Sequence, residues 1–368
     1  MSVRSILNTF NQFFLIWGLG SISYNQSKLN TAIMFSILRC TTIFCGLKTI
    51  YDSNRHWIIH IDPNLFDVTS LVMISCYEMM IIGRFLCNGW RLFYDNKLSV
   101  ILIKLEGIHD KLIRLKALRI GSHWLFNFGI LVHFICYNMS PLYYMIYKSE
   151  RIRQKTVDFY ISLISVVISR ICECVAFYEY MLLISYIKWI VYIINEQIPK
   201  IISTISTFRD LYLEAIECLK DINRSIYGLP VIMSCIAGNV GSIILSLFYR
   251  FLFTEDDTVD VARVIMEADT IIIKMINIIL LYGIGHATAK EINRMSLVLH
   301  QRSIIERNPR IKRQIKFFIL RRHHEDYHFV LYGICEINLQ QLLVLANKAI
   351  AYLVIQILFK LNKNKIID

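Results

Sequence analysis

The sequence predicts an all-α integral membrane protein with seven transmembrane helices, and three observations support this fold class. Of 368 residues, 55% are hydrophobic, and the mean hydropathy is +0.48, whereas a soluble domain is usually nearer 45–50% apolar. The excess falls in runs of about 20 residues, the length at which a helix crosses a hydrocarbon core of roughly 30 Å. The net charge of +12 comes from basic residues between these runs, which favours control of membrane topology over nucleic-acid binding.

The apolar runs define the expected elements in chain order. We expect spans at about residues 31–50, 66–87, 122–147, 156–194, 225–253, 264–286 and 331–359. The fourth run is longer than a bilayer requires, which predicts a helix that continues into the cytosol. The fifth is interrupted by Pro230, Gly238 and Gly241. A short amphipathic piece at 11–24 is expected to lie at the cytosolic interface.

Loop charge predicts the orientation. Three connecting stretches are rich in Lys and Arg, at 89–121, 188–225 and 290–330, while the alternate loops carry fewer. Basic loops stay in the cytosol. The N-terminus is therefore expected inside and the C-terminus outside, the opposite sense to G-protein-coupled receptors.

The last apolar run carries more polar groups than a lipid-exposed helix tolerates: Gln340, Gln341, Asn347, Lys348, Tyr352 and Gln356. Polar residues inside a span usually face a bundle interior or a water-filled path. This predicts that one side of the terminal helix is wet.

The same region resembles the C-terminal signature of insect gustatory receptors, loosely Thr-Tyr, five apolar residues and Gln-Phe. Residues 351–359 read AYLVIQILF, which keeps Tyr352 and Phe359 in register, with Ala351 in place of the Thr and Leu358 in place of the Gln. Upstream, residues 333–338 read GICEIN and are similar to the Gly-Leu-Phe-Glu-Leu-Asn segment of the family.

The resemblance implies a plasma-membrane receptor of chemosensory neurons, a non-selective cation channel gated by an extracellular tastant. It implies a tetramer, of this chain or with related gustatory subunits, held by cytosolic helical extensions that form an anchor. The expected parts are a cytosolic N-terminal segment (1–30), a six-helix ligand-binding bundle (31–330), and a pore-lining seventh helix with a short extracellular tail (331–368). Neither an enzyme activity nor a cofactor is implied, and the partners are tastant, lipids and subunits.

Gate residues follow from this resemblance and from helical spacing. Tyr352, Ile355 or Gln356, and Phe359 lie on one helical face, and four copies of an apolar ring would block ions by dewetting. The alternative is that they pack between helices. Lys348 would repel cations if it faced the lumen, or it points to lipid and snorkels inward.

Ligand-binding candidates are aromatic or ionisable residues in the other spans. Charges at this depth are normally paired, so we expect a local Arg170–Glu173 pair and a Glu78–Lys274 pair between the second and sixth spans, with either a structural or a pocket role. Tyrosines offer an apolar face and a polar tip, although they also belt membrane interfaces. The candidates are Tyr77, Glu78, Tyr137, Tyr144, Arg170, Glu173 and Lys274.

Two other classes of protein remain open. A seven-span receptor coupled to G proteins, or a non-conducting accessory subunit, would share the layout. His324-Glu325-x-x-His328 matches the helical motif of zinc proteases, but no familiar third ligand follows it, so a membrane metalloprotease is a remote alternative.

Overall fold

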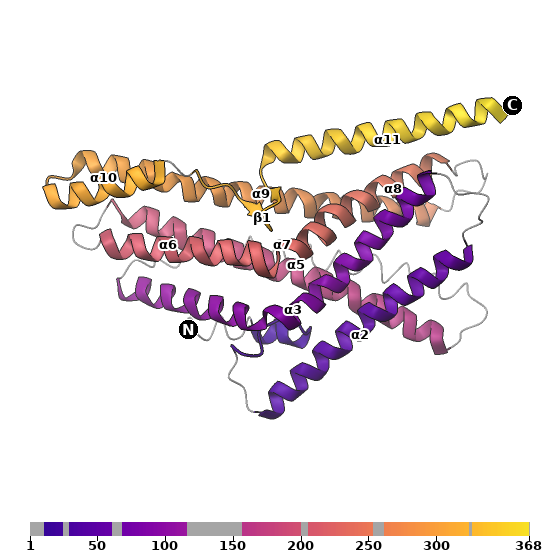
Figure 1. The fold of residues 1–368 in the computed structure, drawn as a ribbon, viewed down its shortest axis with the longest axis horizontal. Coiled ribbons are helices and arrows are strands. Elements are labelled where there is room, and N and C mark those ends of the chain that lie inside the picture. The colour runs from indigo at the N-terminus through magenta and orange to yellow at the C-terminus, as the bar shows by residue number, and fades with distance from the viewer. Residues whose placement is uncertain are drawn as a thin grey trace.

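The computed structural model describes residues 11–24, 29–60, 68–115, 157–199, 205–252, 261–323 and 326–367, and its long elements are all helices (Figure 1). The helices are α2 (Leu29–His60), α3 (Val68–Arg114), α5 (Val157–Gln197), α6 (Ile205–Asp221), α7 (Gly228–Val231), α8 (Asn239–Leu252), α9 (Val261–Ile305), α10 (Pro309–His323) and α11 (Leu339–Ile367). Two short π-helices, η2 (Ile222–Ile226) and η3 (Ile232–Gly238), and two strands, β1 (Val330–Leu331) and β2 (Cys335–Glu336), complete them.

Several of these helices are long and apolar enough to cross a membrane. Within the described residues three segments qualify: 30–52 in α2, 157–197 in α5 and 268–305 in α9. The bent pair 205–226 and 228–244 would be a fourth if the two parts form one span. A shorter apolar stretch, 339–355, lies in α11. The run predicted at 122–147 falls outside the described residues, so the count of seven remains a prediction.

The second expected span and the basic stretch after it form one helix, α3, of 47 residues. Apolar residues recur at helical spacing in its second half, and three of them, Leu98, Leu105 and Ile108, are fully buried. They join a core cluster with residues of α5 and α6. The second halves of α3, α5 and α9 converge with α6 and α10 (Figure 1), and we call this region the α10 end of the molecule.

The chain bends at the start of the fifth expected span, at Tyr227 and so just before Pro230. Segments 205–226 and 228–244 meet there at 63°, and π-helical turns flank the break, where the Tyr227 amide bonds to the Ile222 carbonyl five residues back at 3.0 Å. Pro230 has no N–H to donate, which disrupts the regular ladder. At Gly228 a Cβ atom would come within 1.9 Å of the Asn223 carbonyl oxygen, so only glycine fits.

The chain between α10 and α11 corrects the expected start of the seventh span. Instead of continuing a helix from Leu331, residues 330–336 form a β-hairpin in which Val330 pairs with Glu336 and Leu331 with Cys335. Its turn holds Tyr332 at φ 51° and Gly333 at φ 74°, a left-handed conformation that no helix contains. α11 begins at Leu339, where the Asn338 side chain accepts the Gln341 amide at 2.7 Å and so caps the helix.

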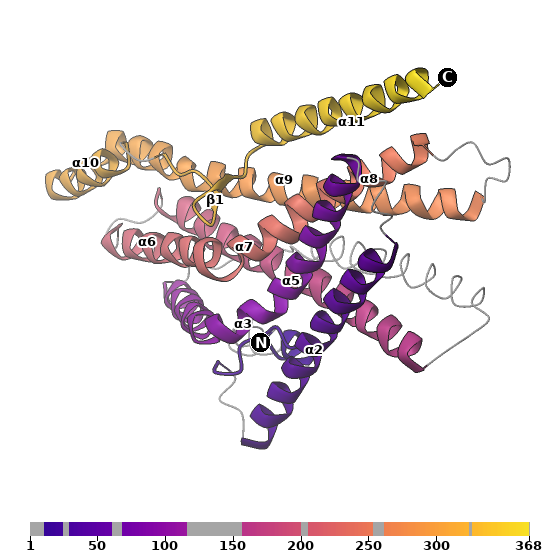
Figure 2. The same cartoon turned by 45° about the vertical axis from the view of Figure 1, so that its right-hand side comes forward.

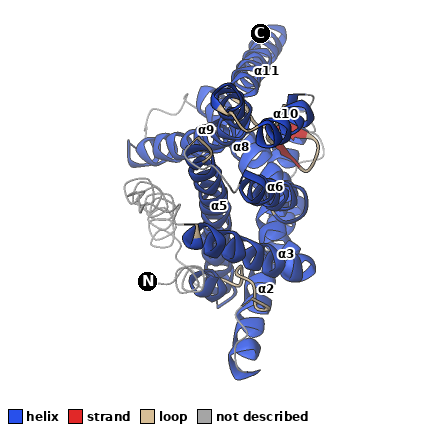
Figure 3. Cartoon of the chain, turned by 90° about the vertical axis from the view of Figure 1, so that its left-hand side faces the viewer, coloured by secondary structure: helices blue, strands red, loops and turns tan. Residues whose placement is uncertain are grey.

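Residues 11–24 bury one side against the bundle and expose the other, where Phe13 and Ile16 are 42% and 57% exposed. The predicted place of this segment at the cytosolic interface stays a prediction. Phe14, Leu15 and Leu19 are fully buried, and the rings of Phe14 and of Tyr178 on α5 lie 6.3 Å apart. In the view down the molecule, α2 and α11 lie at opposite edges, with α5, α6 and α9 between them (Figure 3).

Candidate functional site

α11 is the element that stands farthest from the bundle. It packs on α8 and α9 and then projects away from them, as two views agree (Figures 1 and 2). Leu342 and Leu345 pack against the core, whereas Leu343 and Ile350 are 66% and 61% exposed. A helix with this much exposed apolar surface is typical of one that meets lipid or another subunit.

The expected gate residues lie in the projecting part of α11. Tyr352 is half-buried and Ile355 is exposed, while the side chains of Gln356 and Phe359 lie outside the described part of the chain. Helical geometry over this segment supports the predicted spacing. Their role as a gate stays a prediction.

The hairpin holds the start of α11 to the bundle. The Tyr332 amide donates to the Asn223 carbonyl at the break between α6 and α7, at 3.0 Å. Asn293 of α9 binds the Tyr327 backbone twice, donating to its carbonyl at 3.1 Å and accepting its amide at 2.9 Å. Ile337 packs so closely on Gly285 of α9 that a Cβ there would lie 2.6 Å from its methyl carbon. The segment that precedes α11 is therefore attached both to the break in the α6–α8 helix and to α9.

A buried ion pair lies behind this contact. Arg91 of α3 donates to Glu179 of α5 at 2.6 Å, and the two side chains are 2% and 4% exposed. The Arg91 guanidinium also lies over the Tyr227 ring, 4.2 Å from its centroid, and Tyr180 donates to the Asn223 side chain at 3.0 Å. These contacts connect α3 and α5 to the same break that receives the hairpin.

A small cavity adjoins the pair. It is lined by Arg91, Tyr227, Ser234 and their neighbours and has about 10 Å³ of accessible space, enough for one water molecule. The Arg91 Nη1 atom is buried without a protein partner.

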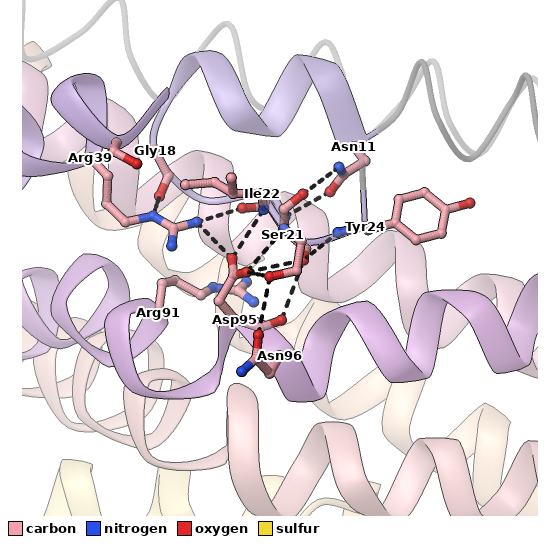
Figure 4. Close-up of polar contacts among 12 residues, drawn as sticks. Asn11, Gly18, Ser21, Ile22, Tyr24, Arg39, Arg91, Asp95 and Asn96 are labelled. Atoms are coloured by element: carbon pink, nitrogen blue, oxygen red, sulfur yellow. Dashed lines mark hydrogen bonds and ion pairs between the residues drawn. The ribbon is translucent and has the colours of Figure 1, made fainter. Parts of the chain in front are cut away.

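A second polar cluster fixes the N-terminal segment (Figure 4). Arg39 of α2 donates to the carbonyls of Gly18 and Gly20, at 2.9 and 2.6 Å, and pairs with Asp95 of α3 at 3.0 Å. Asp95 also accepts the amides of Ile22 and Ser23. The sequence places Arg39 in an apolar run, and this cluster explains how its charge is satisfied there.

The electrostatics of Asp95 reflect these contacts. Burial raises the pKa of the Asp95 carboxyl, but the hydrogen bond from Ser23 and the positive charge of Arg39 outweigh it and lower the pKa overall. A carboxylate with a lowered pKa stabilises the fold above its unfolded pKa, and this stability is lost as the pH falls through the folded-state pKa.

The predicted ligand-binding residues are only partly placed. Glu173 is buried on α5, near the half-buried Arg170, and the expected pair between them stays a prediction. Lys274 donates to the Ser242 hydroxyl of α8, and its expected pair with Glu78 stays a prediction. Tyr137, Tyr144 and the side chain of Tyr77 lie outside the described part.

The zinc-protease motif is also only partly visible. His324 and Glu325 lie outside the described residues, while the His328 imidazole pairs with Glu336 across the hairpin at 2.9 Å. Among the residues that the structure describes, no group of three His, Cys, Asp or Glu could hold a metal ion.

The sequence analysis selects neither the Arg91–Glu179 ion pair nor the hairpin as a candidate functional feature. Arg91 lies at the start of the basic stretch 89–121, where a charge is typical of a solvated surface, and Glu179 lies within the fourth apolar run with no partner nearby in the sequence. The Gly228-Leu229-Pro230 run signals a break, but no local pattern shows that residues 332 and 223 meet.

Comparisons with known proteins agree with this architecture. The fold is similar to that of the insect olfactory receptor OR5 from Machilis hrabei, with a TM-score of 0.71 at 12% identity over 96% of this chain and 97% of that one. The same receptor in complex with eugenol gives a TM-score of 0.68 at 10% identity over 97% of each chain. No curated protein matches the sequence. The model of the 7tm chemosensory receptor family matches residues 3–363, and the chain therefore belongs to this family.

Proposed function

We propose that this chain is a gustatory receptor that acts as a ligand-gated, non-selective cation channel opened by an extracellular small-molecule tastant. The observation that carries the proposal is α11, a mostly apolar helix with several polar side chains that projects from the bundle and is fixed to it at its start. Four such helices around an axis would cover each other's apolar sides. Tyr352, Ile355 and Phe359 would then surround a pore, where apolar rings close a narrow passage.

The α10 end is proposed to be cytosolic and to hold the tetramer together. The basic stretches predicted to stay inside lie there. Ile304, Ile305 and Phe317 expose 70 to 75% of their surface at this end, as expected for contacts between subunits. The partners are further copies of this chain or related gustatory subunits, in the plasma membrane of chemosensory neurons.

The ligand site is proposed to lie in the outer halves of the spans. OR5 has been solved with eugenol, which supports a small amphipathic ligand for this chain too. The candidate residues are Tyr77, Glu78, Tyr137, Tyr144, Arg170, Glu173 and Lys274. A ligand opens the pore only if it binds the open state more tightly than the closed state.

Coupling between ligand and gate is proposed to run through the hairpin. The broken helix α6–α8 and the long helix α9 both contact the segment that precedes α11. A rearrangement of the bundle would therefore move the start of α11 directly, with no other element between them.

Expression of the chain alone tests the function. We expect currents evoked by a panel of small amphipathic tastants in cells where G-protein signalling is blocked. Currents that vanish under the block would favour a receptor coupled to G proteins. A surface-expressed tetramer that stays silent alone but conducts with a related subunit would identify an accessory role.

A further inference from the structure

We infer that an anionic phospholipid of the inner leaflet binds beside the break in the α6–α8 helix, with its phosphate held by Lys97 of α3 and by Lys220 and Arg224 of the broken helix. This binding does not depend on the proposed channel function. The site combines basic side chains, aromatic rings typical of a membrane surface and an exposed apolar ring, on two elements that meet at the break.

The three basic side chains lie on neighbouring elements. α3 packs along α6 and η2, and the Lys97 ammonium donates to the Ser225 hydroxyl at 3.5 Å. Arg224 directly precedes Ser225, and Lys220 lies one turn before Arg224 on the same face of the helix. All three basic side chains are exposed, so a group at the membrane surface can reach them.

The positive charge of these three residues is not cancelled locally. In the described part of the chain no ion pair involves any of them, whereas Lys104, further along α3, pairs with Glu217 at 3.2 Å. The carboxylate of Asp95, on the preceding turn of α3, is held by Arg39 at 3.0 Å. Asp221 contributes one negative charge beside the three positive ones. The excess of positive charge complements a phosphate ester, which lysine and arginine bind through charge-assisted hydrogen bonds.

Aromatic rings place this region at the level of the inner membrane surface. The second span is expected to end at about residue 87 and the fifth to begin at about residue 225. Trp90 and Tyr94 follow on α3, with ring centroids 5.3 Å apart, and the Trp90 indole donates to the Ser225 carbonyl at 2.7 Å. Tryptophan and tyrosine are enriched at the headgroup level. Lys97 lies roughly 15 Å along α3 from residue 87, and its long side chain can reach back towards the headgroups.

An exposed apolar ring favours a lipid over a soluble anion. Phe93 is 80% exposed and lies one turn before Lys97 on the same face of α3, on the side towards the span. An acyl chain beside the phosphate would cover this ring, whereas a phosphate ion would leave it in water. The cationic and apolar groups therefore match the two parts of one phospholipid.

The site adjoins the contact that holds the segment before α11. Arg224 follows Asn223, whose carbonyl accepts the Tyr332 amide of the hairpin at 3.0 Å. A phosphate bound by both α3 and η2 would connect the two elements at the break. A ligand that binds only the folded arrangement stabilises it, so the lipid should raise the melting temperature of the protein.

Native mass spectrometry tests the binding. The purified full-length chain in neutral detergent is titrated with phosphatidylserine. Each basic side chain near an anionic surface contributes about fivefold in affinity, so Lys97→Gln with Arg224→Gln should weaken binding of the first phosphatidylserine by about 25-fold. The control, Lys290→Gln with Arg310→Gln, removes one exposed lysine and one exposed arginine from other elements and should leave this binding unchanged.

Melting temperatures separate a loss of binding from a loss of folding. Without lipid, both double variants should melt as the wild type does, because the side chains that they remove are exposed. Phosphatidylserine should stabilise the wild type and the control but not the Lys97 and Arg224 variant, and phosphatidylcholine or inorganic phosphate should stabilise none of them.

Three results decide between the alternatives. Equal binding of phosphatidylserine by the two double variants would overturn the inference. Stabilisation by inorganic phosphate as large as that by phosphatidylserine would also overturn it, because the site would then bind a soluble anion. An absence of ligand-evoked currents would overturn the proposed channel and leave the lipid site unaffected.

Discussion

Replacing Arg91 by Met tests whether the buried ion pair stabilises the junction between α3, α5 and the broken helix. The change leaves Glu179 without its partner at a site where both side chains are almost fully buried. Removing one member of such a pair costs about 3–5 kcal/mol, because the other charge stays desolvated. The free energy of unfolding, measured by SDS titration of the protein in mild detergent, should fall by this amount.

The double variant Arg91→Met with Glu179→Leu makes the prediction sharper. Replacing both charges by apolar groups is often neutral, so stability should return to within about 1 kcal/mol of the wild type. As a control, Lys104→Met breaks the exposed Lys104–Glu217 pair, whose side chains are 33% and 62% exposed, and should cost less than about 1 kcal/mol. A double variant whose loss equals the sum of the two single losses would refute the reasoning.

Three further predictions concern the contacts that position α11 and the N-terminal segment. Gly228→Ala puts a Cβ against the Asn223 carbonyl and the Tyr332 amide, so ligand-evoked current should fall at least tenfold in protein that still assembles. Gly283→Ala on α9, where a Cβ meets nothing within 4 Å, should keep it, and equal effects would contradict the coupling role. Wild-type protein should lose stability below about pH 4, because the lowered pKa of Asp95 makes stability depend on its ionisation there. Asp95→Asn should remove this part of the acid destabilisation. Identical pH profiles of melting temperature for the wild type and the variant would contradict the prediction. Asn293→Ala should reduce the ligand-evoked current while assembly persists. An unchanged dose–response curve would show that the two hydrogen bonds from Asn293 to the Tyr327 backbone do not contribute to gating.

The sequence predicts the helical content and the extension of α3 and α5 beyond their apolar runs well, because both depend on local periodicity. Leu98, Leu105 and Ile108 recur at helical spacing and prove to be core. A break near Gly228 and Pro230 can also be predicted from the sequence, since glycine and proline act through their own backbones.

The parts that depend on contacts distant in sequence could not be predicted. Residues 331–338 are apolar enough to resemble a span, but Leu331 and Ile337 are buried against the bundle, and the turn at Tyr332 and Gly333 requires a left-handed backbone. Arg39 in an apolar run gives no sign of its partner Asp95, 56 residues away.

The central claim is that α11 lines a water-filled path, and cysteine accessibility tests it most directly. In a tetramer, Tyr352→Cys should react with a membrane-impermeant thiol reagent faster in the presence of an activating ligand than at rest. Leu342→Cys, on the face that packs on the core, should stay unreactive in both states. A cysteine at 352 that never reacts, at rest or with ligand, would contradict the pore.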